Sequence, residues 1–255
     1  MSVVEPGAAG AGLFARVKAM IMQPGATWDA IDGEPATVGD LYRGYVMPLA
    51  AIPVVAGAIG MIVFGIGGWG FTIRLSPVWV IVNAIVGYAL ALAMVFVTAL
   101  VIEALAENFG GQKNRIQALK VAAYFPTAYW VAGIFALVPA LALLALVGGI
   151  YSLWTLYLGL PKLMKAPQER AGGYFAVVLV VTIVVGIVIA LVTSSITGMA
   201  GANRVLAGGS VSGTVSVPGV GSVDVGKLEG MSKRAEAAAR QIESGEAGPV
   251  TDPDV

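Results

Sequence analysis

The sequence contains no cysteine and no histidine. This absence excludes disulfides, thiol chemistry, zinc sites built on either residue, and catalytic dyads or triads that need them. Charged residues are also scarce at 12% of the chain, whereas soluble domains average about 25%. Cationic and anionic side chains number 15 each, so the net charge is zero. The charge balance therefore offers no argument for nucleic acid as a partner.

Apolar residues take the place of the missing charge. They make up 58% of the 255 residues, and the mean hydropathy is +0.85. A water-soluble protein of this length could not hide so much apolar surface. The apolar runs are continuous and lack the alternation of membrane strands. The composition therefore predicts an all-α, polytopic membrane protein with the lipid bilayer as its surroundings and no cofactor.

The longest apolar run extends without a charge from Val121 to Pro161, between Lys120 and Lys162. At about 1.5 Å rise per residue, this run is about twice as long as the hydrocarbon core is thick. Pro139 lies near its midpoint, and proline interrupts a helix because it lacks an N–H and clashes with the preceding turn. We therefore predict a helical hairpin of two spans, whose ends return to the same side.

Together with the other apolar runs, the hairpin predicts a bundle of five transmembrane helices within residues 45–200. The expected spans are residues 45–66, 78–102, 119–137, 140–160 and 174–198. One side of such a bundle would carry most of the cations: Arg16, Lys18, Arg43, Lys113, Arg115, Lys120, Lys162, Lys165 and Arg170. The opposite side would carry Arg74 and Arg204 near the membrane. By the positive-inside rule, the N-terminus is predicted to be cytoplasmic and the C-terminal tail to be outside.

The two terminal regions are predicted to lie outside the membrane core. Residues 1–44 form a cytoplasmic segment with an amphipathic helix, on which Leu13, Val17, Met20 and Ile21 share one face and Arg16 and Lys18 point elsewhere. This helix would lie in the membrane interface or pack on its own protein's cytosolic face, and the pattern favours neither. Residues 201–255 form a tail rich in Gly, Ser and Val, predicted to be flexible with one short helix.

Carboxylates gather in two places. Asp29, Asp32 and Glu34 form a small cluster that Gly33 and Pro35 place on a turn, where we expect a solvated loop. Glu103 and Glu107 mark the end of the second span. At a span's edge they reach headgroup water, which we favour over a buried functional role. We predict no catalytic, cofactor-binding or metal-binding residue.

Small residues recur along the fifth span at intervals of four. Gly186, Ala190, Ser194 and Gly198 form a seam on one helix face. Such seams let neighbouring backbones approach closely in lipid. The partner would be another span or a second copy of the chain, and we favour another span.

Three segments carry a resemblance to a known family. They are QPGATWDAIDGEP leading to DLYRGYVMPLA, then ALKVAAYFPTAYWVAGIFALVP, and then GGIYSLWTLYLGLPKLMKAP. Together they resemble the Yip1 family of five-span membrane proteins, specifically its bacterial branch, over about residues 13–200. Within the hairpin, most of the resemblance lies in Tyr124, Pro126, Tyr157, Gly159 and Pro161. We interpret these five residues as kink, interface and packing positions.

The resemblance implies a cytosolic N-terminus, an outside C-terminus and no catalytic residues. Eukaryotic members resemble adaptors that engage small GTPases, but the short N-terminal segment shows no GTPase-binding motif. We predict a non-enzymatic integral protein of the bacterial inner membrane that organises lipids, other membrane proteins or a second copy of itself. The alternative is a small transporter or channel subunit, in which Pro53 and Pro126 would break helices along a polar path. A lipid-modifying enzyme would have to use the five carboxylates named above.

Overall fold

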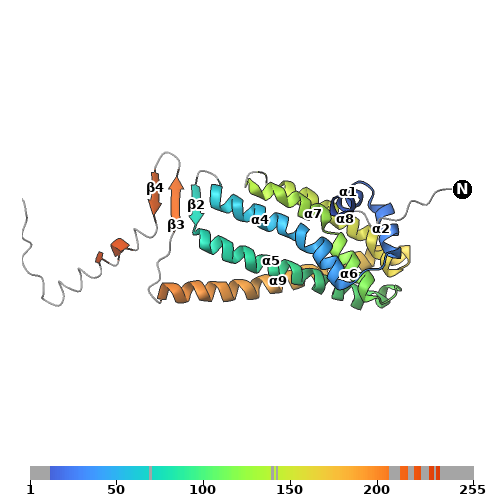
Figure 1. The fold of residues 1–255 in the computed structure, drawn as a ribbon. Helices are drawn as coiled ribbons and strands as arrows, with labels where there is room; N and C mark the ends of the chain where they lie inside the picture. Colours follow the sequence, from blue (N-terminus) through green and yellow to red (C-terminus); the bar gives the residue numbers. More distant parts are fainter. Residues whose placement is uncertain are drawn as a thin grey trace, which may run out of the picture.

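The computed structural model describes residues 12–68, 71–138, 141, 143–206, 213–217, 221–224, 230–232 and 234–235. Within residues 66–75 and 188–224 it describes the backbone only. Long helices run side by side along the molecule (Figure 1). The N-terminal helices lie at one end of this bundle, and a small antiparallel sheet lies at the other.

The N-terminal segment folds into short helices. They are α1 (Leu13–Met22), α2 (Pro24–Gly33) and α3 (Val38–Leu41). Thr37 caps α3, because its hydroxyl accepts from the backbone N–H of Asp40 while the Asp40 carboxylate accepts from the N–H of Thr37. A π-helical turn, η1 (Tyr42–Val46), then leads without a break into α4 (Met47–Phe64).

Four helical stretches in the described part of the chain are long and apolar enough to cross a membrane. They are Val38–Phe64, Pro77–Leu105, Leu144–Leu163 and Gln168–Ile187. The last three belong to α5 (Pro77–Leu105), α8 (Leu144–Met164) and α9 (Gln168–Leu206). They correspond to the first, second, fourth and fifth predicted spans. The helical membrane class predicted from the composition is therefore confirmed.

The third predicted span, residues 119–137, is not one continuous helix. It consists of α6 (Arg115–Tyr124), α7 (Thr127–Ala132) and a 3₁₀ segment, η3 (Gly133–Leu137). The break lies at Pro126, the residue before α7. Hydroxyl groups bond carbonyls beside it: Thr127 Oγ1 donates to the carbonyl of Tyr124 at 2.5 Å, and Thr155 Oγ1 to that of Phe125 at 3.0 Å. The break expected at Pro139 lies outside the described residues, but η3 ends at Leu137 and α8 begins at Leu144.

The sheet joins two regions that are far apart in the sequence. Its order is β1 (Ile66–Gly68), β2 (Phe71–Leu75), β3 (Gly213–Val217) and β4 (Gly221–Asp224), with every pair antiparallel. Thr72 is opposite Ser216, so the loop between α4 and α5 pairs with the tail after α9. β3 and β4 lie in the tail that was expected to be flexible, and its flexibility remains a prediction. Of the expected short helix, residues 230–232 and 234–235 are helical and the remainder lies outside the described residues.

The helix α4 and the segment η3 make very close contacts. A Cβ added at Gly60 in α4 would lie 2.4 Å from the carbonyl oxygen of Ala136. One at Gly133 would lie 2.5 Å from Pro53 Cβ, and α4 continues through this proline. At Gly186, by contrast, the nearest atom is Met94 Cε at 3.8 Å, an ordinary contact. The side chains of Ala190, Ser194 and Gly198 lie outside those described, so the predicted seam remains a prediction.

Candidate functional site

The most fully buried large side chain outside the spans is Trp28, which α2 inserts between α6 and α8. Its indole N–H donates to the carbonyl of Thr155 in α8 at 3.0 Å. Its ring meets the edge of Tyr124 in α6, with centroids 6.4 Å apart. Across from it, a Cβ at Gly159 would lie only 2.6 Å from Trp28 Cε2. Glycine at 159 therefore leaves the space that the indole occupies.

Tyr124 extends this contact to η1, the turn that leads into α4. Its ring packs against Tyr45 with centroids 4.4 Å apart, and the Tyr45 hydroxyl bonds the Thr127 hydroxyl at 2.7 Å. Arg16 of α1 lies over the face of Tyr124, 5.9 Å from the ring centroid, in cation–π geometry. Residues from all three family-resembling segments thus meet here. We call this assembly, built on Trp28, Tyr124 and Gly159, the tryptophan junction.

Ion pairs surround the tryptophan junction. Lys162 at the end of α8 contacts both carboxylate oxygens of Asp29 at 2.7 Å and donates to the carbonyl of Gly25 at 2.7 Å. Lys165 pairs with Asp32. Arg16 contacts both carboxylate oxygens of Glu34 at 2.8 Å. The expectation of an acidic loop is wrong for Asp29 and Asp32, which lie in α2, and each of the three carboxylates has a cationic partner from another part of the chain.

A buried lysine closes the end of α2. Lys120 donates to the carbonyls of Ile31 at 2.8 Å and Glu34 at 2.5 Å. Carbonyls at a helix C-terminus lack partners inside the helix and carry the negative end of its dipole, so an ammonium group stabilises them. Gln117, one turn earlier on α6, donates to the carbonyl of Asp32 at 3.0 Å. Thus α6 supplies the cap that α2 lacks in its own sequence.

The orientation of α1 differs from the expected one. Arg16 is buried together with Met20, whereas Lys18 is exposed along with Phe14 and Met22. The expected division holds for Lys18 and is wrong for Arg16, because Glu34 and Tyr124 contact its guanidinium group inside the protein. α1 packs on its own protein, as one of the two expectations held. Its outward face is nevertheless rich in apolar surface.

Glu103 and Glu107 lie where the helices α5 and α6 are joined. Glu103 accepts from Arg115 at 3.0 Å, and Glu107 lies 3.6 Å from Lys113. Beside them, the Tyr174 ring of α9 stacks on Phe109 with centroids 5.2 Å apart. All five carboxylates considered in the sequence therefore take part in ion pairs. No group of three or more residues able to hold a metal ion occurs in the described part of the chain.

The other family-resembling residues surround the tryptophan junction. Pro161 is buried within α8, one turn before the end of that helix, and Pro126 separates α6 from α7. Tyr157 is exposed and meets the edge of Phe175 with ring centroids 5.8 Å apart. Sequence reasoning missed Trp28, Arg16 and Lys120 as members of the site. One signal was present: a tryptophan within a polar, turn-rich segment is unusual unless it is buried elsewhere.

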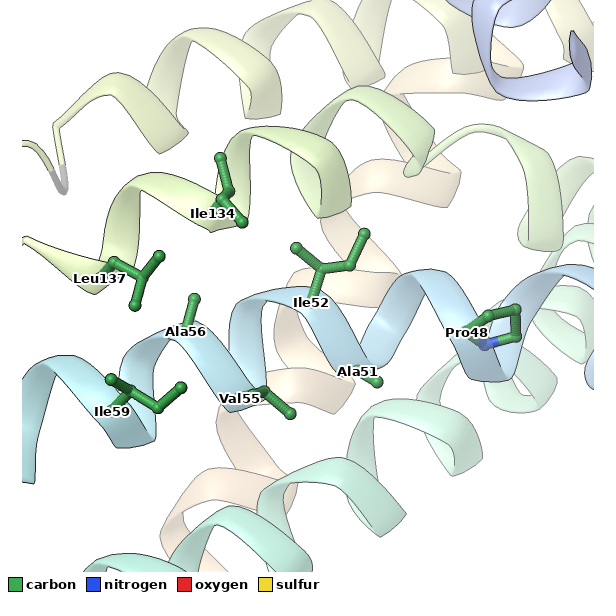
Figure 2. Close-up of a pocket in the computed structure, with 8 residues that line it drawn as sticks. All are labelled: Pro48, Ala51, Ile52, Val55, Ala56, Ile59, Ile134 and Leu137. Carbon is green, nitrogen blue, oxygen red and sulfur yellow. The ribbon is translucent and has the colours of Figure 1, made fainter. Parts of the chain in front are cut away.

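Apolar cavities lie along the bundle away from the junction. One of about 350 Å³ lies between α4 and η3, and Figure 2 shows its eight lining residues: Pro48, Ala51, Ile52, Val55, Ala56, Ile59, Ile134 and Leu137. A second, of about 330 Å³, borders the break at Pro126 and includes Thr98, Ser152 and Thr182 in its lining. The first has no polar side chain, and the second has mainly apolar ones.

Comparison with known proteins finds a family profile and related membrane proteins. The profile of the Yip1 domain matches residues 18–191, a stretch that contains Trp28, Tyr124 and Gly159 of the tryptophan junction. The chain is 28% identical to the inner membrane protein YohC of Escherichia coli K12 over 174 residues, which cover 67% of this chain and 89% of the relative. The same protein of Escherichia coli O6:H1 matches equally well. No solved structure matches the chain significantly.

The match confirms the resemblance read from the three segments, and with the apolar helices it confirms an integral protein of the inner membrane. More than half of the chain lies within the matched range. The three segments in which the resemblance was read contribute residues to the tryptophan junction. This chain belongs to the Yip1 domain family of membrane proteins.

Proposed function

We propose that this chain is a non-enzymatic membrane protein that organises lipids or membrane partners around a rigid five-span bundle. The observation that carries the proposal is the tryptophan junction, where the segments typical of the family meet. Its aromatic rings fill a packed space, and its charges are neutralised by one another. Such an assembly would hold α1 and α2 on the bundle. Each carboxylate of the junction is paired with a cation, so none is available there as a general base.

The five-span arrangement is part of the proposal. In it, the broken segment α6–α7–η3 provides the third crossing. The pairing of β2 with β3 supports it, because the loop after α4 and the tail after α9 must then share one side. The N-terminal helices lie at the opposite end (Figure 1). An odd number of crossings is consistent with the N-terminal helices at one end and the tail after α9 at the other. By the positive-inside rule, the distribution of lysine and arginine predicts that the N-terminal end is cytoplasmic.

The absence of cysteine makes this topology simple to test. We expect a single cysteine at Gly209 to react with an impermeant thiol reagent added outside spheroplasts. A single cysteine at Gln168, which is exposed at the start of α9, should react only after the membrane is permeabilised. Labelling of both positions from outside, or of Gln168 alone, would contradict the proposed orientation.

Purification tests the organising role directly. We expect the chain, extracted in mild detergent with its lipid shell, to retain a reproducible membrane partner or an enriched lipid class. A variant with Trp28→Ala should lose it, because α1 and α2 are then no longer fixed. Repeated purification with neither a partner nor an enriched lipid would refute the proposal.

The alternative, a small transporter or channel subunit, has one observation in its favour. The helix break at Pro126 borders the cavity of about 330 Å³, in which the Thr182 hydroxyl has no hydrogen-bond partner among the described residues. Broken helices beside a cavity are a feature of transporters. The mainly apolar lining weakens this reading. Flux of a panel of solutes into proteoliposomes, above that of empty vesicles, would establish it.

The match indicates a membrane protein family and no enzyme family. An enzyme acting on lipid would depend on the carboxylates at the cytoplasmic end. Alanine at each of Asp29, Asp32, Glu34, Glu103 and Glu107 should then abolish turnover. Under our proposal these substitutions change stability, in proportion to the burial of each ion pair.

A further inference from the structure

The outward face of α1 carries large apolar side chains. Phe14, Lys18 and Met22 are spaced four residues apart and share one stripe of the helix. Phe14 is 82% exposed and Met22 is 69% exposed, while Arg16 and Met20 on the other face are buried. We call these three residues the outer stripe. The exposure of two large apolar side chains on one helix indicates that this face contacts apolar surroundings, such as lipid, rather than water.

The helix α1 lies against the side of the bundle rather than across its cytoplasmic end. The carbonyl of Ile21 in α1 accepts from the Tyr151 hydroxyl at 2.5 Å. Tyr151 precedes the last residue of α8, Met164, by thirteen positions, which is about 20 Å along a helix. It therefore belongs to the membrane-spanning stretch Leu144–Leu163. Figure 1 also places α1 next to α7 and α8. The face of α1 turned away from the bundle thus looks sideways, towards lipid.

Aromatic residues mark the same level of the bundle. Tyr151 contacts the ring of Trp154, with centroids 5.2 Å apart, and Trp154 is 47% exposed. Exposed tryptophan and tyrosine side chains gather where the acyl chains meet the headgroups. Gly25, three residues after the end of α1, accepts from Lys162 near the cationic end of α8 at 2.7 Å, so α1 lies between the level of Tyr151 and that end.

We propose that α1 binds anionic phospholipid in the cytoplasmic leaflet. Phe14 and Met22 insert among the acyl chains, and Lys18, between them, pairs with a headgroup phosphate. Lys18 forms no ion pair within the described part of the chain, unlike its neighbour Arg16. A basic, amphipathic surface helix has this behaviour. The inference rests on the proposed function, and it names the lipid class and the residues that would bind it.

Environment-sensitive labels on single cysteines test the depth of α1. The chain has no cysteine of its own. We place labels at positions 14 and 22 in vesicles of phosphatidylglycerol and phosphatidylcholine. Spin-labelled acyl chains should quench both labels. Aqueous iodide should quench them at least threefold less than it quenches a control label. The control label is at Ala26, which is exposed on α2. Iodide quenching at 14 and 22 equal to that at 26 would overturn the proposal.

The headgroup preference is tested by Lys18→Gln. In the parent protein, spin-labelled phosphatidylglycerol should quench the label at 14 severalfold more than spin-labelled phosphatidylcholine, and Lys18→Gln should remove the difference. Lys113→Gln, which changes an exposed cation already paired with Glu107, should leave it unchanged. Equal quenching by the two lipids in the parent would overturn the proposal of an anionic lipid. Protection from iodide without quenching by lipid would also overturn it, and would indicate a protein or a second copy on the outer stripe. Solute flux through the chain would refute the proposed function and leave this result unaffected.

Discussion

Replacement of Trp28 by alanine should lower the free energy of unfolding by about 3–5 kcal/mol, the range for truncating a large core aromatic residue. The indole fills the space over Gly159 and donates to Thr155, and alanine removes both interactions. Trp154→Ala provides the control, because that side chain is on α8 but 47% exposed. Chemical unfolding in mixed micelles measures both variants. Equal losses for the two would contradict the role assigned to Trp28.

Substitution of Gly159, which faces the Trp28 indole, is a second test of the same contact. Gly159→Ala places a methyl group 2.6 Å from the rigid indole ring, and such overpacking costs about 1–3 kcal/mol. Gly172→Ala is the matched control, because no atom lies within 4 Å of its added Cβ. Most of the cost of Gly159→Ala should disappear in a chain that already carries Trp28→Ala, since neighbouring sites couple.

The second large effect is expected from Glu34→Ala. The side chains of Arg16 and Glu34 are only 8% and 16% exposed, so Glu34→Ala removes one partner of a buried ion pair. Breaking one partner of a buried pair costs about 3–5 kcal/mol. The Tyr124 face stays over Arg16, which favours the lower end of this range. The same unfolding measurement applies.

Glu107→Ala is the control for Glu34→Ala. It breaks an ion pair with Lys113 in which both side chains are at least half exposed. Exposed pairs contribute about 0–1 kcal/mol. If Glu34→Ala and Glu107→Ala have the same small effect, the ion pairs around the tryptophan junction do not hold α1 and α2 on the bundle.

The long apolar runs made most of the fold predictable. A run of about 20 apolar residues must be satisfied within lipid, so its helical form and approximate bounds follow from local sequence. The third span was predicted as one helix, and its division into α6, α7 and η3 was not predicted. Pro126 divides it, and the hydroxyl of Thr155, from another helix, helps to satisfy the carbonyls at the break. No local pattern indicates such a partner.

The tryptophan junction could be predicted in its parts but not in its assembly. The family-resembling segments were recognisable, yet their convergence depends on contacts between residues about 90 to 140 positions apart, such as Lys120 with Ile31 and Lys162 with Asp29. For the same reason Arg16 was assigned to the wrong face of α1, whereas Met20 and Val17 pack inward as expected. Helical periodicity treats Arg16 as an outward residue, whereas its partner Glu34 comes from beyond the next helix.

A cross-link between α2 and α8 tests most directly the claim that Trp28 holds the N-terminal helices on the bundle. Asp29 and Lys162 are in contact, so cysteines in their places should be joined by a short bis-maleimide in native membranes. The account predicts a high yield of the internal link in this chain and a severalfold lower yield when Trp28→Ala is added. No link between two cysteines that both react with maleimide, or a yield that Trp28→Ala leaves unchanged, would contradict it.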